Sequence, residues 1–466
     1  MELTLEHVLI MVATLVFVIG GGIYAAGSVK SAEGYSLGGR KSGVAMVAGS
    51  IAGTVVGGGA TIGTAQMAYT MGLSAWWFTI GSGTAFILMG LFYARKLRET
   101  GLETIPQYLR RNYGNKAAEA AGIISSAGIL FSAVASCLPG IQIIGAVLGT
   151  STVASAVVLI ALVAGYVFFG GMKSSGVGGI LKMAVIWFSL LAAGAAAVLE
   201  IGQMPDVTAV FPAGHWFNMF NHGAGSSLAS FFSMIVGVLC TQTYIQCIFS
   251  ASSPKVAATA SFTAAAIVIP VGLPSVAIGM YMHAFNPDVL PILVLPIYLI
   301  QHQPVWLAGI ALGGIMLSII GSVGGLCLGV GTVLTKDVIG KAVNLGEGKK
   351  LLYTIRFVVI GCMALACGIA IYNLDSQVLF WNYLSMAMRG CGVFLPLTIA
   401  IFSPRSIAKK WVYASIIIST VLPLALEPFV ALPVSPLFVG IAISAVMLFV
   451  GYEKRWRPIP KMQQEM

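Results

Sequence analysis

The 466-residue chain is 58% hydrophobic and only 9% charged, and its mean hydropathy is +0.95. A chain of this composition has lipid as its main solvent, which excludes an ordinary soluble protein and indicates one integral membrane domain. The net charge of +10 resides in short loops beside apolar segments, so we expect anionic lipid headgroups, and no nucleic acid, as partners of the basic residues.

Apolar runs divide the chain into about thirteen segments, and a helix needs roughly 20 residues to cross a bilayer. We therefore predict an all-α polytopic membrane protein. The first segment follows acidic rather than basic residues, so we expect a retained helix rather than a cleaved signal peptide. The predicted spans cover residues 5–27, 43–73, 75–95, 117–148, 151–171, 176–199, 226–252, 256–284, 303–334, 352–373, 377–402, 410–428 and 433–452.

The basic residues are sorted to one side of these spans. Of the 25 Lys and Arg residues, all but Lys182 and Arg389 lie at span ends that face the same side, and the loops of the other side hold none. Short loops rich in Lys and Arg stay in the cytoplasm during insertion. The sequence thus predicts a multi-pass protein of the cell membrane, with its N-terminus outside and its C-terminus in the cytoplasm.

The second span is interrupted at mid-membrane depth by the run Gly53-Thr-Val-Val-Gly-Gly-Gly-Ala-Thr-Ile-Gly63. Each glycine weakens a helix by roughly 1 kcal/mol relative to Ala, so we expect a break. Freed backbone groups are tolerated in lipid where they line a cavity or bind an ion or substrate. The alternative is close helix packing through small residues.

The seventh span carries a matching polar interruption, Cys240-Thr-Gln-Thr-Tyr-Ile-Gln246, five spans after the first. An odd offset reverses the direction of the second unit, so the two units form candidate inverted repeats with a site between them. We divide the single transporter domain into residues 1–42 (first helix and loop), 43–199 (first repeat), 226–402 (second repeat) and 410–466 (two extra helices and a cytoplasmic tail).

Four stretches are typical of one family: Gly34-Tyr-Ser-Leu-Gly-Gly-Arg40, Ile62-Gly63 with Ala68-Tyr69 and Gly72, Thr104-Ile-Pro-Gln-Tyr-Leu109, and Gln242 to Gln246 with Ser250-Ala251. Together with the span count, they resemble the sodium:solute symporter family, which includes bacterial proline, sialic acid and galactose symporters. The resemblance implies a ten-helix inverted-repeat core of the leucine-transporter type and transport by alternating access.

The resemblance also implies a sodium site where the broken first core helix meets the eighth. In this chain, the resemblance implies that the sodium site is formed by the carbonyls of Gly53 and Val56, opposite Ser318, Gly321 and Ser322. The match is incomplete, because members usually carry a hydroxyl residue where this chain has Gly321. In the sixth span, members commonly carry an Asp and a Gln where this chain has Gly179 and Lys182.

Lys182 lies about 10 Å into its span, since a helix rises 1.5 Å per residue. Two interpretations stay open. The lysine can reach the cytoplasmic interface along its apolar stem, or its ammonium can occupy the sodium position. In the second case protonation can do what ion binding does, and the transporter is proton-coupled or independent of sodium.

Arg389 lies near the centre of its span, out of reach of either headgroup layer, so it must face a polar interior. Its guanidinium can hold a substrate carboxylate in a two-pronged contact, or it can act as a structural clamp or gate on backbone carbonyls. The predicted substrate cavity comprises Arg389, Thr54, Gly57, Gly58, Gly59, Gln242, Tyr244 and Gln142.

The leading functional hypothesis is secondary active transport of a small organic solute that carries a carboxylate, coupled to Na⁺ or H⁺. The alternatives are an ion-independent exchanger or uniporter on the same fold, or a solute sensor. No His, Asp, Glu or Cys cluster lies at depth for general acid or nucleophilic chemistry, so an enzyme is not expected. We expect no cofactor beyond a possible coupling Na⁺, and the sequence does not fix the oligomeric state.

Overall fold

In the computed structural model, every regular element of the described part of the chain is helical, as predicted. The structure describes residues 3–27, 29, 31–168, 171–221, 223–340, 343, 346, 348–426 and 435–453. The predicted tail after Glu453 and residues 427–434 between the last two spans lie outside these ranges.

The helices follow the predicted segments closely; η marks a 3-10 or π helix. The first half comprises α1 (Leu5–Ala26), α2 (Ala32–Leu37), η1 (Gly38–Arg40), α3 (Val44–Val55), η2 (Gly59–Gly63), α4 (Thr64–Met71), η3 (Gly72–Trp76), α5 (Trp77–Leu88), η4 (Met89–Tyr93), α6 (Ala94–Glu99), α7 (Ile105–Tyr113), α8 (Asn115–Leu148), α9 (Thr152–Val167) and α10 (Gly171–Gly202). The second half comprises α11 (Val207–Val210), α12 (Ala213–Trp216), α13 (Ala224–Leu239), α14 (Gln242–Ser250), α15 (Pro254–Phe285), η5 (Pro291–Leu293), α16 (Val294–His302), α17 (Val305–Val333), η6 (Leu334–Ile339), α19 (Lys349–Ile371), α20 (Val378–Arg389), η7 (Gly390–Phe394), α21 (Leu395–Phe402), α22 (Lys409–Leu426) and α23 (Pro436–Val450).

Length and composition alone give fewer spans than the thirteen predicted. Among the described residues, nine helices are long and apolar enough to cross a membrane, or ten if the bent pair α13 and α14 is one span. One of the nine, Gly59–Glu99, has 41 residues. At 1.5 Å per residue it is about twice as long as the hydrocarbon core is thick, and Gly72, with φ +56°, interrupts it. The number of spans also falls below thirteen because α3, α9 and α23 are apolar but too short to be counted as spans.

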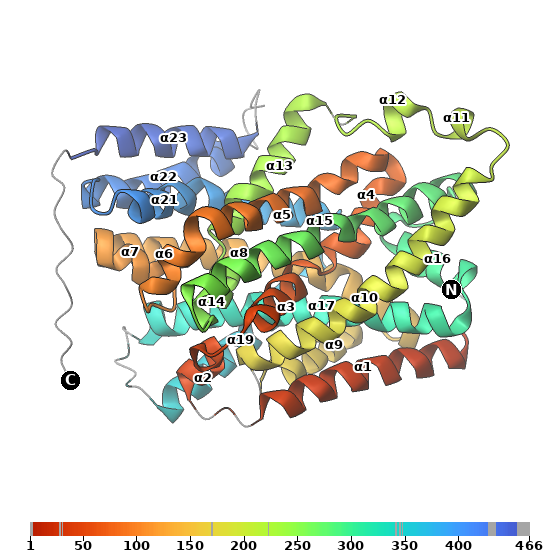
Figure 1. Ribbon diagram of the computed structural model, residues 1–466, viewed down its shortest axis with the longest axis horizontal. Helices are drawn as coiled ribbons and strands as arrows, with labels where there is room; N and C mark the ends of the chain where they lie inside the picture. The colour runs from red at the N-terminus through yellow and green to blue at the C-terminus, as the bar shows by residue number, and fades with distance from the viewer. Residues whose placement is uncertain are drawn as a thin grey trace.

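The long helices run between two ends of the molecule, and α17 lies at the centre. Figure 1 shows α2, α6 and α7 together at one end and α11, α12 and α16 at the other. In the most apolar window of the α17 span 94% of residues are buried, against 28% for α1. Arg40, Arg98 and Arg110 belong to the end with α2, α6 and α7. These three predicted cytoplasmic arginines thus share one end of the fold.

Both predicted interruptions are confirmed as breaks between helices. At the first interruption, α3 ends at Val55 and the π helix η2 begins only at Gly59. At the second interruption, α13 ends at Leu239 and α14 begins at Gln242, and the two helices are bent by 44°.

We propose that the end with α2, α6 and α7 faces the cytoplasm, as the charge pattern predicts. A cysteine introduced at Leu290, which is 64% exposed in the predicted outer loop, should react with a membrane-impermeant maleimide in intact cells. A cysteine at the exposed Lys350 should react only after permeabilisation. The background is low because all seven native cysteines are free and buried. The reverse pattern would invert the proposed topology.

Candidate functional site

The break after α3 frees backbone carbonyls inside the membrane. The Gly57 N–H donates to the Val55 carbonyl at 2.9 Å instead of continuing the α-helical pattern, which would pair it with Gly53. Three carbonyl oxygens in this stretch, those of Gly53, Thr54 and Val56, each accept a hydrogen bond from a side chain of another helix. Buried carbonyls without partners are costly, so these three donors stabilise the break.

Lys182 supplies one of the three donors. Its side chain is 1% exposed, and its Nζ donates to the Gly53 carbonyl and to the Ser318 carbonyl, the latter at 3.2 Å. The ammonium therefore lies between α3, α10 and α17 and does not reach the cytoplasmic interface. A buried sodium ion would require carbonyl oxygens of the same kind around it.

Glycines on all three helices make room for this contact. A β-carbon on Gly53 would lie 2.7 Å from the Cα of Gly179, and one on Gly179 would lie 2.2 Å from the Gly49 carbonyl oxygen. A β-carbon on Gly321 would lie 3.2 Å from the Lys182 Nζ. The three departures from the family pattern, at positions 179, 182 and 321, are therefore neighbours in space.

Two serines of α17 supply the other donors. The Ser318 Oγ donates to the Val56 carbonyl at 2.5 Å, and the Ser322 Oγ donates to the Thr54 carbonyl. The Thr54 hydroxyl in turn donates to the Ser50 carbonyl at 2.8 Å. The structure thus brings all six predicted ion-site residues together: Gly53, Val56, Lys182, Ser318, Gly321 and Ser322.

The predicted glycine run is also a point of close helix packing. A β-carbon on Gly57 would lie 2.1 Å from the Ser322 hydroxyl of α17, and one on Gly59 would lie 2.7 Å from the Asn382 amide of α20. Gly58 packs against α8 in the same way. The break and the close packing, which the sequence left as alternatives, therefore occur together.

Arg389 is fully buried beside the second break. Its Nη2 donates to the Ser132 hydroxyl of α8 at 3.3 Å and lies 2.8 Å from the Met386 sulfur. Its Nε and Nη1 are buried and have no hydrogen-bond partner among the described residues. Cys240, at the break, and Tyr244 of α14 lie close enough to interact electrostatically with the guanidinium. Guanidinium nitrogens without acceptors cost free energy when buried.

The other predicted cavity residues are placed as follows. Tyr244 packs edge-on against Phe86, with ring centroids 5.3 Å apart. The Gln142 amide donates to the Leu374 carbonyl at 2.9 Å. Gln242 accepts from the Ile105 N–H at 2.8 Å and donates to the Glu103 carbonyl at 3.0 Å. Both glutamine amides are thus engaged with backbone, and that of Gln242 ties α14 to the start of α7.

Ion pairs and the Thr104 hydroxyl connect helices at the end of the molecule near α2 and α7. Lys336 pairs with Glu103, and Arg110 pairs with the buried Asp337 at 3.0 Å. The Thr104 hydroxyl also donates to Asp337, at 2.6 Å. We call these five residues the charged cluster. It joins η6, at the end of α17, to α7 and the segment before it.

Sequence reasoning missed three polar residues around Arg389 and the first break. Ser132 and Ser385 share a hydrogen bond of 2.7 Å, and Ser385 also donates to the Gly128 carbonyl. Asn382 lies one turn before Ser385 in α20. The three-residue spacing of these two polar positions within an apolar span was the available signal, because it places them on one helix face.

Among the described residues, no group of three or more His, Cys, Asp or Glu side chains is arranged to hold a metal ion. The oxygens of the first break are carbonyls and hydroxyls, which suit a hard monovalent cation. In the structure the Lys182 ammonium already contacts the Gly53 carbonyl of the break and the Ser318 carbonyl of α17.

A family model for sodium:solute symporters matches residues 35–417. The chain belongs to this family. The family prediction and the expectation of a transporter rather than an enzyme are therefore confirmed, as is a multi-pass membrane protein.

The relatives include the high-affinity choline transporter 1 of Homo sapiens, 25% identical over 361 residues, or 71% of this chain and 62% of the human protein. The match thus spans less than two thirds of the human protein's length. The Caenorhabditis elegans transporter of the same name is 24% identical over 424 residues, or 84% of this chain and 73% of that protein.

Solved structures confirm the leucine-transporter type of core. A substrate-bound, outward-open Na⁺-coupled sialic acid symporter superposes with a TM-score of 0.80 at 16% identity, covering 96% of this chain and 97% of that one. A nucleobase-cation-symport-1 family transporter in a closed conformation gives a TM-score of 0.60 at 11% identity, covering 88% of this chain and 92% of that one. Identities this low show the fold alone.

We predict that Gly179→Ala lowers the free energy of unfolding by about 1–3 kcal/mol, because its methyl group would collide with the Gly49 carbonyl and force α10 away from α3. Thermal melting of the purified protein measures this change. Gly165→Ala is the control, because a β-carbon at Gly165 meets no atom of the described residues within 4 Å. Equal melting of the two variants would contradict the close packing that positions Lys182.

Proposed function

We propose that this chain is a secondary transporter of a small organic anion in which the Lys182 ammonium takes the place of the coupling sodium ion. The observation that supports this most directly is the pair of hydrogen bonds from Nζ to the Gly53 and Ser318 carbonyls. These carbonyls belong to the two helices, α3 and α17, between which the family resemblance places the ion.

The ammonium and a sodium ion share a single positive charge and a demand for oxygen ligands. They differ in one respect, since the ammonium is covalently held by α10 and exchanges only a proton. A protonated Lys182 joins α3 to α17, and the neutral amine lacks the charge that the carbonyls attract. Proton-coupled symport therefore follows if the lysine gains and loses its proton during the cycle.

An ion-independent exchanger or uniporter is the second candidate, and the same contact favours it. If Lys182 keeps its proton throughout, the ammonium acts as a permanent link between α10, α3 and α17. Uptake by reconstituted protein under an imposed pH gradient separates the two candidates. Acceleration by an inward proton gradient supports symport, and exchange that ignores the gradient supports the exchanger.

The proposed substrate class rests on Arg389. Two of its nitrogens are buried and have no hydrogen-bond partner in the part of the chain that the structure describes. A carboxylate can accept from a guanidinium with both of its oxygens. The choline transporter relatives are named for a cation, which this positive charge would repel. The sialic acid symporter is named for an acid. We infer that the solute carries a carboxylate.

We expect sodium chloride to stabilise the wild-type protein no more than the chloride of a large organic cation at equal ionic strength. Thermal melting is a sensitive measure, because an ion at a hundred times its dissociation constant would add about 2.7 kcal/mol. The double variant Lys182→Ala with Gly321→Ser removes the ammonium and restores a hydroxyl, so it should gain sodium-specific stabilisation.

Lys173→Ala is the matched control for this experiment, because Lys173 also belongs to α10 but is exposed. It should behave as the wild type. Sodium-specific stabilisation of the wild type would refute the replacement of the ion by Lys182.

Arg389→Lys should reduce the uptake of carboxylates at least tenfold, because lysine cannot make a two-pronged contact. A panel of small carboxylates and choline, screened first by thermal shift, supplies the substrate. Arg356→Lys is the control, because Arg356 is a buried arginine whose guanidinium lies over the rings of Tyr35 in α2 and Phe168 directly after α9. Unchanged carboxylate uptake by a folded Arg389→Lys protein would remove the arginine from the substrate site.

A further inference from the structure

A cationic cavity lies at the end of the molecule near α7, away from both helix breaks. Its volume is about 590 Å³, and three segments line it: the end of α7, the connection between α21 and α22, and Glu453 after α23. Four lining residues are cationic, namely Arg110, Arg111, Arg405 and Lys409, and one is acidic, Glu453. A cavity of this size accommodates a small molecule or a headgroup.

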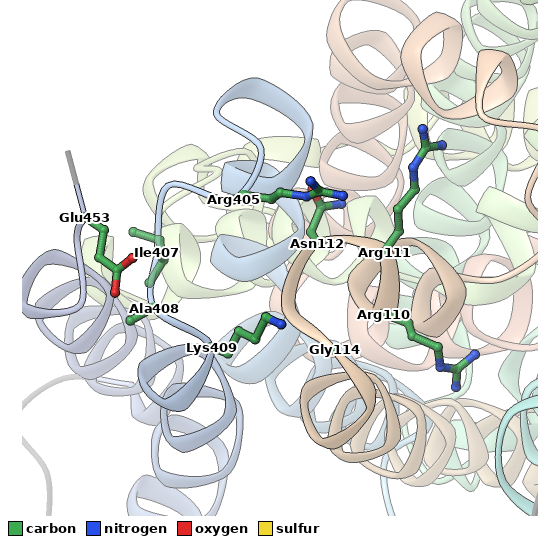
Figure 2. Close-up of a pocket in the computed structure, with 9 residues that line it drawn as sticks. All are labelled: Arg110, Arg111, Asn112, Gly114, Arg405, Ile407, Ala408, Lys409 and Glu453. Carbon is green, nitrogen blue, oxygen red and sulfur yellow. The ribbon is translucent and has the colours of Figure 1, made fainter. Parts of the chain in front are cut away.

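Three of the four cations that line this cavity form no ion pair within the described part of the chain. The four ion pairs found among the described residues include Arg110, which pairs with Asp337, but not Arg111, Arg405 or Lys409. Figure 2 shows Arg405 and Lys409 extending across the cavity toward Asn112 and the turn at Gly114, while Arg110 points away from it. Two like charges directed into one cavity repel each other unless an anion lies between them.

The wall that carries Arg405 and Lys409 is held in place by the backbone. Arg405 has φ +59°, one of only two non-glycine residues with positive φ among those described. The segment is fastened on both sides by hydrogen bonds, from Ala408 N–H to the Gly451 carbonyl at 2.9 Å and from Glu453 N–H to the Ser406 carbonyl at 2.8 Å. A left-handed arginine held this way points to a functional constraint.

Two long helices also begin at this cavity. The N-terminus of α8 follows Gly114, which has no side chain to cap it, and α22 starts at Lys409. The partial positive charge of a helix N-terminus favours anions. This partial charge adds to the positive potential of the arginine and lysine side chains, and those side chains are by themselves enough to make the cavity cationic.

We propose that this cavity binds a phosphate-bearing anion, supplied either by a lipid headgroup or by a free phosphate compound. Arginine and lysine directed into a cavity are the usual partners of phosphate oxygens. The site is separate from Lys182 and Arg389, so it stands or fails independently of the transport proposal. Since Arg110 also belongs to the charged cluster, α7 connects this cavity to η6 at the end of α17.

The test compares three full-length proteins: the wild type, Arg405→Gln with Lys409→Gln, and the control Lys349→Gln with Lys350→Gln, which removes two exposed cations that do not line the cavity. Thermal melting is followed in detergent with pyrophosphate against chloride at equal ionic strength. It is also followed in nanodiscs of phosphatidylglycerol against phosphatidylcholine. We expect wild type and control to be stabilised, and the cavity variant to need at least tenfold more ligand.

Stabilisation by pyrophosphate identifies a free phosphate compound as the source, and stabilisation by phosphatidylglycerol alone identifies a lipid headgroup. Equal shifts in all three proteins, or no shift with either probe, would overturn the proposal. If the double glutamine variant does not fold, Ala408→Glu replaces it, because it adds a negative charge to the cavity wall while keeping both cations. It should lose the same stabilisation.

Discussion

Backbone groups inside a membrane have no water to bond with, and this constraint governs the centre of the structure. The break after α3 frees the carbonyls of Gly53, Thr54 and Val56, and α10 and α17 supply one side-chain donor for each. The donors reach the carbonyls only because glycines let the three helices approach closely. The deep burial of α17 is a consequence, since it contributes two of the donors and contacts helices of both halves.

The two buried cations are stabilised in different ways. The Lys182 Nζ donates to two backbone carbonyl oxygens, so the backbone dipoles partly compensate its charge. Within the described ranges, the Arg389 guanidinium has one oxygen acceptor, and two of its nitrogens have no acceptor. A lysine with acceptors suits a permanent internal link, and an arginine without them suits a ligand that comes and goes. This contrast underlies the different roles proposed for the two residues.

The sequence predicted the helix breaks because contiguous glycines and a polar run within apolar spans are local signals. It could not choose between the two interpretations of Lys182, because depth along a span says nothing of the neighbouring helix. Gly321, 139 positions further along the chain, becomes informative only when α17 lies against α10. The sequence could not show the backbone partners of Gln242 for a related reason, since positions 103 and 105 are distant from it along the chain. The cationic cavity joins three separate segments and leaves no local pattern.

The covalent attachment of Lys182 to α10 has an energetic consequence. A sodium ion that crosses the membrane brings with it both its concentration ratio and the electrical potential, and a potential of 100 mV is worth about 2.3 kcal/mol per charge. A tethered ammonium is never released, so without proton exchange at Lys182 this chain would forgo that source of work. With a lysine that stays protonated, the current carried per cycle would be that of the solute alone. Inward movement of an anion would then be opposed by a negative interior, and net flux would follow the solute's own electrochemical gradient.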